Sequence, residues 1–304
     1  MREAPRDPAR DLVRGLLPGI PRDCRPGSRG WCAAVACLLE AAAPKPGNVH
    51  PGAAFADLSF ADLAAAAVAI APAVERAADR RLGATILEAV SAARDVTPSN
   101  ANLGIVLAIA PLAAAAVPRP RDVAGVLAGL GPADAADVWR AIAIARPGGL
   151  GRVARWDVAD AAPDDLLAAM RLAAPRDAIA RLWAEGYEDL VTGPVADLAA
   201  ELAAGHTLTD AIVRSHLRQL ARVPDSLIVR RHGADVAAEV SLRAAATLAA
   251  ADWRPAAAAL DASLRSPRRI NPGTTADLVA AALFVLLSEG RLAIDPVPAP
   301  AAPR

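Results

Sequence analysis

Apolar residues recur at helical spacing along most of the chain, in alanine- and leucine-rich stretches that Pro, Gly, Ser, Thr and Asp interrupt. The alternation typical of a β-strand is scarce, and the short run SLIVRR at 226–231 is the one strand-like segment. The pattern predicts an all-α fold, a compact multi-helix bundle of about a dozen helices. The expected helices span residues 31–42, 60–80, 84–94, 103–116, 133–145, 164–173, 176–190, 195–204, 208–222, 234–251, 256–264 and 276–287.

Two of these helices begin with a capping-box pattern, Ser59 with Asp62 and Thr207 with Asp210. In such a box the hydroxyl and the later acid satisfy opposite backbone amides. Alanine-rich faces allow helices to pack closely, and no repeat of fixed period is present, so we expect a bundle rather than a solenoid.

Both ends of the chain lack sustained helical periodicity. Residues 1–28 mix Pro, Arg, Gly and Asp, and DPVPAPAAPR at 295–304 is too rich in proline to form a helix. We therefore expect a flexible N-terminal tail at 1–28, a single all-helical domain at 29–292 and a proline-rich C-terminal tail at 293–304.

Charge and hydropathy exclude several classes of protein. The chain has 33 basic and 33 acidic residues, so no overall field recruits nucleic acid or an anionic membrane. The longest apolar run, 103–117, contains Pro111 and is too short to span a bilayer. The first residues lack the apolar core of a secretory signal, so we expect a cytoplasmic protein, with homo-oligomerisation left open. The three cysteines lack zinc-ligand spacing and are expected to be reduced thiols: Cys24, Cys32 and Cys37.

The rare residues gather in loops beside glycine or proline. Lys45 is the single lysine, and the four asparagines lie in KPGNVHPG, TPSNANLG and RRINPGTTADL: Asn48, Asn100, Asn102 and Asn271. Capping alone explains any one asparagine, but their joint placement favours a shared site. Helix starts offer free amides and a partial positive charge to an anion, and Gly47, Gly104 and Gly273 would let the backbone approach it.

Arginine forms a second set of candidates. Arg146 and Arg152 flank the glycine loop ARPGGLGR, and Arg230 begins RRHG, an arrangement that favours binding of phosphate oxygens. The alternative is a solvated loop. His50 and His232 lie beside these loops, whereas His206 and His216 have ordinary helical surroundings and are expected to be structural.

Carboxylates could hold Mg²⁺ or stabilise a cation. The candidates are Asp57, Glu88, Asp157, Asp177, Asp225, Glu239 and Asp277. No Walker loop, HExxH, cysteine–histidine metal pattern or nucleophile elbow is present in the sequence.

These motifs together resemble one family. PKPGNVH, FADLSFADL, NANLG, RRHGADVAAEVS and NPGTTADLVAAALF are similar to segments of the triphosphoribosyl-dephospho-CoA synthase family, which is all-helical. The similarity runs from about residue 31 to 289, and the first and last motifs are the specific ones. In that family, ATP loses adenine and its triphosphoribosyl group passes to the ribose 2′-hydroxyl of dephospho-CoA.

The resemblance implies ATP and dephospho-CoA as substrates of a catalytic domain at 29–292, with Mg²⁺ as cofactor. Lys45-Pro46-Gly47 match the family's Lys-Pro-Gly, Asp57 matches the acid that follows, and Asn271-Pro272-Gly273 with Asp277 match the C-terminal signature. We expect catalysis from Asp57, Glu88 and Asp277, and Mg²⁺ on Asp57 and Asp277. The expected nucleotide- and phosphate-binding residues are Lys45, Gly47, Asn48, His50, Asn100, Asn102, Gly104, Arg146, Arg152, Arg230, Asn271, Gly273 and Thr274.

One motif departs from the family. Better-known members read Asn-Thr-His-Lys-Gly where this chain reads Asn100-Ala101-Asn102-Leu103-Gly104, without the histidine and the second lysine. Either Arg146, Arg152 or Arg230 replaces the missing cation, or the chain is a divergent member. Such a member would transfer a riboside or phosphoribosyl group to another acceptor, such as a pterin-type precursor, or hydrolyse a nucleotide. A non-catalytic nucleotide-binding protein is the third alternative.

Overall fold

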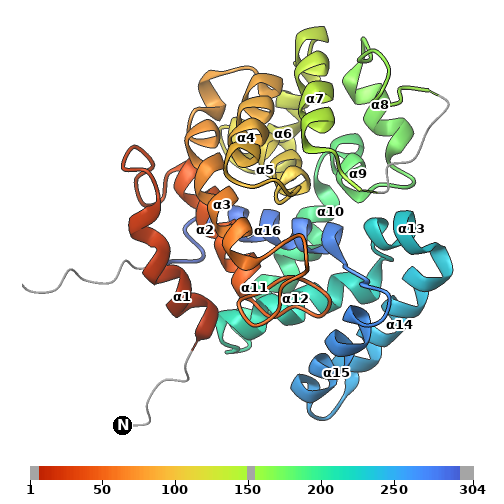
Figure 1. The fold of residues 1–304 in the computed structure, drawn as a ribbon. Helices are drawn as coiled ribbons and strands as arrows, with labels where there is room; N and C mark the ends of the chain where they lie inside the picture. The colour runs from red at the N-terminus through yellow and green to blue at the C-terminus, as the bar shows by residue number, and fades with distance from the viewer. Residues whose placement is uncertain (1–6, 149–154, 295–304) are drawn as a thin grey trace, which may run out of the picture.

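The computed structural model describes residues 7–148 and 155–294, which fold into packed helices without a sheet (Figure 1). The first helices are α1 (Pro8–Leu16), α2 (Arg29–Ala42), α3 (Phe60–Glu75), α4 (Leu82–Val96), α5 (Leu103–Ala114), α6 (Pro120–Ala128), α7 (Pro132–Ala145) and α8 (Leu166–Ala173). They are followed by α9 (Ala178–Glu185), α10 (Glu188–Leu190), α11 (Ala196–Ala203), α12 (Leu208–Arg222), α13 (Ser226–His232), α14 (Ala234–Ala249), α15 (Trp253–Arg265) and α16 (Gly273–Ser288). Short 3₁₀ turns lie at Leu17–Gly19 and Ala77–Asp79, and a π-helical turn lies at Val191–Val195.

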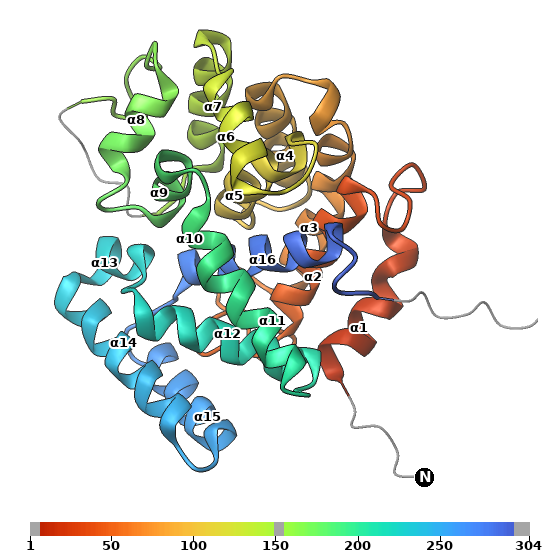
Figure 2. The same ribbon diagram turned by 180° about the vertical axis from the view of Figure 1, so that it is seen from behind.

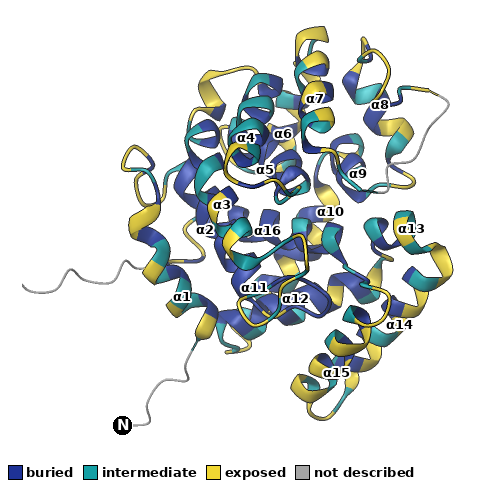
Figure 3. Cartoon of the chain, viewed as in Figure 1, coloured by how far each residue is buried: buried dark blue, intermediate teal, exposed yellow. Residues whose placement is uncertain are grey.

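Helices α2 and α16 form the centre of the molecule. Nearly every residue of both is buried, and their small alanine side chains let neighbouring helices approach on all sides. In Figure 1, α16 crosses the middle of the molecule with α3 to α9 on one side and α11 to α15 on the other. Figure 2 shows α10, α11 and α12 covering the back of α16. Figure 3 shows that the exposed residues lie on the outer helices. Because α2 and α16 are buried, a polar residue on either helix is an exception.

The predicted all-α fold is confirmed, but the strand-like reading of 226–231 is wrong. These residues form α13, because the Asp225 side chain accepts hydrogen bonds from the N–H groups of Leu227 and Ile228 and so fixes a helix start. The expected helix at 176–190 is also interrupted. Gly186 and Tyr187 both have positive φ angles, 73° and 70°, which end α9.

The expected N-terminal tail at 1–28 is also wrong where the structure describes it, from residue 7 onward. Residues 8–16 form α1, whose apolar side chains Ala9 and Val13 are buried against the core. Asp7 caps α1 through the N–H of Arg10 and also accepts from Leu208 and Thr209 at the start of α12. The apolar residues Ala9, Leu12, Val13 and Leu16 of α1 do recur at helical spacing, but over one short segment among the prolines and arginines of 1–28. Residues 1–6 and 295–304 lie outside the described part.

Two further expectations concern chemistry and membranes. Cys24, Cys32 and Cys37 are buried free thiols, as predicted. Within the described ranges, none of the helices combines the length and the apolar character that crossing a membrane requires.

Candidate active site

The loop that follows α2 turns Lys45 inward. Its ammonium group is fully buried, lies 2.8 Å from the Glu40 carboxylate, and donates to the backbone carbonyls of Glu40 and Ala43. The sequence placed Lys45 among the phosphate-binding residues, and the structure instead shows a buried ion pair that ties the loop to α2. The residue before each proline, Ala43 and Lys45, is restricted to extended backbone, which ends α2 and lets the loop fold back onto it.

The same loop then meets the start of α16. The side-chain amide of Asn48 donates to Asn271 Oδ1 at 2.6 Å and lies 3.4 Å from the Pro272 carbonyl. Gly47 has φ of +79°, and a Cβ there would lie 2.8 Å from the Ile270 carbonyl oxygen, so the close approach requires glycine. The structure therefore brings together the first and last motifs, which are more than two hundred positions apart.

Arginine side chains form the rim beside this contact. The Arg265 guanidinium pairs with Asp261 and donates to the Asn48 carbonyl, while that of Arg269 pairs with Asp57. Both guanidinium groups lie over the ring of Phe55, at 5.5 and 4.4 Å from its centroid. Asp57 is exposed, and the Arg269 guanidinium holds the pKa of its carboxyl group below the usual value.

Asp277 lies one turn into α16 and faces the start of α5. A methyl group on Gly104 would lie 2.6 Å from Asp277 Cγ, so the carboxyl group fills the space that glycine leaves. Asp277 is partly exposed, and no hydrogen bond to it is present within the described part of the chain. It is thus a carboxyl group held by packing, with its polar atoms left for another partner.

The surroundings of Asp277 favour its protonated form. Burial raises its pKa well above the usual value, and the negative charges of Glu40, Asp225 and Asp177 raise it further. Arg230 opposes the shift. A carboxyl group that keeps its proton is suited to act as an acid.

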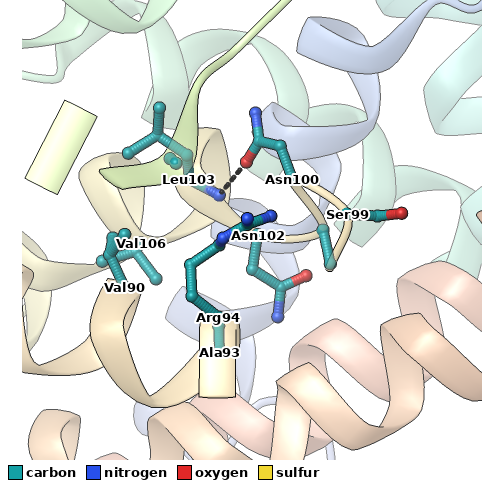
Figure 4. Close-up of a pocket in the computed structure, with 10 residues that line it drawn as sticks. Val90, Ala93, Arg94, Ser99, Asn100, Asn102, Leu103 and Val106 are labelled. Atoms are coloured by element: carbon teal, nitrogen blue, oxygen red, sulfur yellow. Dashed lines mark hydrogen bonds between the residues drawn. The ribbon is translucent and has the colours of Figure 1, made fainter. Parts of the chain in front are cut away.

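The asparagines of the NANLG loop do not join the Asn48–Asn271 pair. The Asn100 oxygen accepts from the Leu103 N–H at 3.4 Å, and Figure 4 shows Asn100 and Asn102 pointing in different directions. Asn102 is buried, and the hydrogen-bonding groups around it orient its amide toward the Ala101 carbonyl and the Ala67 N–H. The cavity drawn in Figure 4 holds about 10 Å³, room for one water molecule and not for a nucleotide.

The loop still belongs to the site region. The Ser99 hydroxyl donates to the Asp57 carbonyl, which fastens the loop to the 43–58 segment. Its helix, α5, brings Gly104 against Asp277.

Two of the expected free amides at the start of α16 are already used. The Gly273 N–H donates to the Asn271 carbonyl at 2.8 Å, and the Thr275 N–H donates to Asp225 at 2.7 Å. Thr274 is buried and its hydroxyl oxygen accepts from Ser226. Gly273 lies against Leu227 with no space for a side chain, so its role here is close packing.

The arginine candidates are divided. Arg230 pairs with Asp177 at the inner side of α13. Arg146 ends α7 in the left-handed conformation and is exposed, and the adjacent Gly148 lies against the guanidinium of Arg231. Arg152 lies outside the described residues.

Two predicted residues have other surroundings. Glu88 is partly exposed on α4 and pairs with Arg76 and Arg80, so two arginines already engage its carboxylate. His50 is half-buried beside the Asn48 contact, and its pKa is lowered by burial and by the charge of Arg265.

Sequence reasoning missed four residues of the site: Glu40, Asp261, Arg265 and Arg269. Glu40 gave a signal, because it is the single acid within the apolar run of α2 and lies five residues before the single lysine. Asp261 and Arg265 are four residues apart on one helix, a spacing that predicts an ion pair but not its place beside Asn48.

Among the residues that the structure describes, no three His, Cys, Asp or Glu side chains are grouped to hold a metal ion. Asp57 is moreover engaged by Arg269. The residues present therefore do not fit the expected Mg²⁺ site on Asp57 and Asp277.

Comparisons with known proteins agree with these motifs. The family model of ATP:dephospho-CoA triphosphoribosyl transferases (CitG) matches residues 27–295. The crystal structure of a proposed triphosphoribosyl-dephospho-CoA synthase from Archaeoglobus fulgidus is similar, with a TM-score of 0.58 and 23% sequence identity, over 74% of this chain and 98% of that chain. A search of the curated proteins found no match. The structural likeness indicates a shared fold, and the family match covers every element of the site.

Proposed function

The chain belongs to the ATP:dephospho-CoA triphosphoribosyl transferase family, and from this membership we propose how its residues carry out the reaction. The enzyme transfers the triphosphoribosyl group of ATP to dephospho-CoA. We propose that the reacting atoms lie beside the Asp277 carboxyl group, where α16 packs against the start of α5. The observation that supports this most strongly is the Asp277 carboxyl group, packed against Gly104 with no hydrogen-bond partner among the described residues.

The chemical step needs a proton for the leaving group. The bond between ribose C1′ and adenine N9 breaks, its electron pair leaves with adenine, and C1′ bonds to the acceptor oxygen, which we propose is the ribose 2′-hydroxyl. Asp277 donates a proton to the departing base, and the acceptor hydroxyl releases one, so the protons balance. The raised pKa of Asp277 supports this role, because the acid form persists to higher pH.

The triphosphate needs cations that it can reach, and not ones that are fully buried beside an acidic partner. Lys45 does not qualify, because its charge is paired with Glu40 and fully buried. We propose that the phosphate oxygens are held by the two rim arginines, Arg265 and Arg269, and by Arg231, whose charge also acts on Asp57. Two acidic partners, Asp57 and Asp261, face these three guanidinium groups, so the rim keeps a net positive charge.

Asn48 and Asn271 contribute shape rather than charge in this proposal. Their side-chain hydrogen bond fastens the 43–58 loop to α16, which sets the distance between the rim and Asp277. Mg²⁺ would then enter as part of the ATP complex rather than on a resident site. No observation favours another acceptor, nucleotide hydrolysis or a non-catalytic role.

Adenine release tests the reaction directly. The protein is incubated with ATP with and without dephospho-CoA, and free adenine and the mass of the acceptor are measured. We expect adenine only when dephospho-CoA is present, in a one-to-one ratio with modified acceptor. Release without acceptor would mean hydrolysis, and no release under either condition would contradict the proposal.

A further inference from the structure

Three helices begin together next to Asp277: α9, α13 and α16. Asp177 caps α9 by accepting from the N–H groups of Ile179 and Ala180, at 2.9 and 3.0 Å. The Ser226 hydroxyl, at the first position of α13, lies 3.3 Å from the Ala178 N–H of α9. It also donates to the Thr274 hydroxyl of α16, at 3.1 Å. We call this set of helix starts the three-helix junction.

Asp225 joins two of these helices with one carboxylate. Its Oδ1 accepts from Leu227 and Ile228 of α13 at 2.8 and 3.0 Å, and its Oδ2 accepts from the Thr275 N–H and hydroxyl of α16 at 2.7 and 2.8 Å. The residue is 3% exposed. Each oxygen therefore serves a different helix, and four donors depend on this side chain.

Charged groups on these helices act on one another beside the proposed site. Helix α16 carries Asp277 two residues after Thr275, and α13 carries Arg230 two residues after Ile228. Arg230 in turn pairs with Asp177 at the start of α9. A change in the way that Asp225 holds the two helices therefore moves both charged groups relative to each other.

We infer that Asp225 is a positioning residue for the transfer, whose two oxygens hold α13 and α16 so that Asp277 faces the departing base. This inference rests on the role proposed for Asp277. Asp225 itself is buried behind the helix starts with its oxygens occupied, so it acts through the position of Asp277 and not on the substrate. A misplacement of about 1 Å at a reacting group costs about a hundredfold in rate.

Asp134 provides a matched control away from the site. It too is buried and joins two helix starts with one oxygen each, because Oδ1 accepts from Gly83 of α4 and Oδ2 from Gly131 before α7. Neither α4 nor α7 carries a group of the proposed machinery. Asp134→Asn therefore removes the same kind of cap without moving Asp277.

The experiment compares Asp225→Asn, Asp134→Asn and Asp277→Asn with the wild type. Asparagine offers one acceptor oxygen, so either orientation leaves one helix without its cap. We measure Tm, kcat for adenine release with dephospho-CoA present, and KM for ATP, at a temperature where every variant is folded. We expect a similar loss of Tm in Asp225→Asn and Asp134→Asn. We also expect kcat to fall at least about tenfold in Asp225→Asn but not in Asp134→Asn. KM for ATP should change less than about twofold in both.

Thr275→Val is included in case Asp225→Asn does not fold, because it removes only the hydroxyl donor to Oδ2. It is expected to lower kcat by more than about twofold. The inference is overturned if kcat of Asp225→Asn stays within about twofold of Asp134→Asn, or, where Asp225→Asn is unfolded, if Thr275→Val keeps the wild-type kcat. If Asp277→Asn keeps the wild-type kcat, the proposed role of Asp277 fails. If kcat falls in Asp277→Asn but not in Asp225→Asn, only the positioning role of Asp225 is contradicted.

Discussion

At the scale of single residues, Gly104 is the position where one added atom has the clearest effect. A methyl group there would meet the end of the Asp277 side chain, 2.6 Å from Cγ, and not the backbone. Asp277 can turn away, so we expect Gly104→Ala to remain folded but to lose about a hundredfold in kcat for adenine release, because the carboxyl group is displaced from the reacting atoms.

Gly125 is the matched control for this change. It lies within α6, is exposed, and a methyl group there meets nothing within 4 Å. Gly125→Ala should gain about 0.5–1 kcal/mol of stability from helix propensity and keep the wild-type kcat. Equal kcat values for the two glycine variants would contradict the contact between Gly104 and Asp277.

Lys45 gives the second prediction at this scale. The sequence placed Lys45 among the phosphate-binding residues, whereas its buried pair with Glu40 predicts that replacing it lowers stability. Lys45→Met leaves Glu40 buried and unpaired, which should cost about 3–5 kcal/mol in the free energy of unfolding, measured by urea denaturation. The double variant Glu40→Gln, Lys45→Met should recover much of that loss. A single variant as stable as the wild type would argue against the pair.

The rarity of Lys45 and of the asparagines identified residues that make important contacts, but it did not predict what those contacts are. The sequence predicted that Asn48 and Asn271 meet, and they do. It could not show that Glu40 neutralises Lys45, because burial depends on how the loop folds back onto α2. Whether a lysine binds phosphate or forms an internal ion pair depends on that burial.

At the scale of secondary-structure elements, α1 depends on one aspartate that serves two helices. Asp7 caps α1 and accepts from the Leu208 and Thr209 amides of α12. We expect Asp7→Ala to lower the free energy of unfolding by about 1–3 kcal/mol, since it removes caps of about 1 kcal/mol from two helices. Thermal melting measures the loss. Asp11→Ala, one turn further along α1 on an exposed position, is the control and should change Tm little.

Helix periodicity and caps predicted most elements because each signal is local. The errors at 8–16 and 226–231 both fall on short helices that begin at an aspartate cap. Asp7 and Asp225 each cap their own helix and also accept from a second helix distant in sequence, and no local pattern shows the second partner. Similarly, the meeting of α9, α13 and α16 depends on packing across the whole chain.

At the scale of the whole molecule, stability should fall on the acid side because of His216. This side chain is fully buried in α12, and neither ring nitrogen has a hydrogen-bond partner in the described part of the protein. Burial, and next the charge of Lys45, lower its pKa well below 6.5. The unfolded chain therefore binds a proton at a pH where the folded protein does not, so stability is lost as pH falls through about 6.5.

Melting curves at pH 7.5 and 5.5 measure this effect. We expect the wild type to lose more Tm on acidification than His216→Leu, in which the titrating group is absent and His50 is retained. The same loss in both proteins would show that other groups control the acid side.

The account as a whole holds that the carboxyl group of Asp277, packed against Gly104, drives adenine departure during triphosphoribosyl transfer. The most direct measurement is the rate of adenine release by Asp277→Asn with saturating ATP and dephospho-CoA, beside Glu88→Gln on the outer face of α4. We predict a rate at least about a hundredfold lower for Asp277→Asn, with ATP binding retained, and a wild-type rate for Glu88→Gln. Wild-type release by Asp277→Asn, with product formed in the same ratio, would contradict the account.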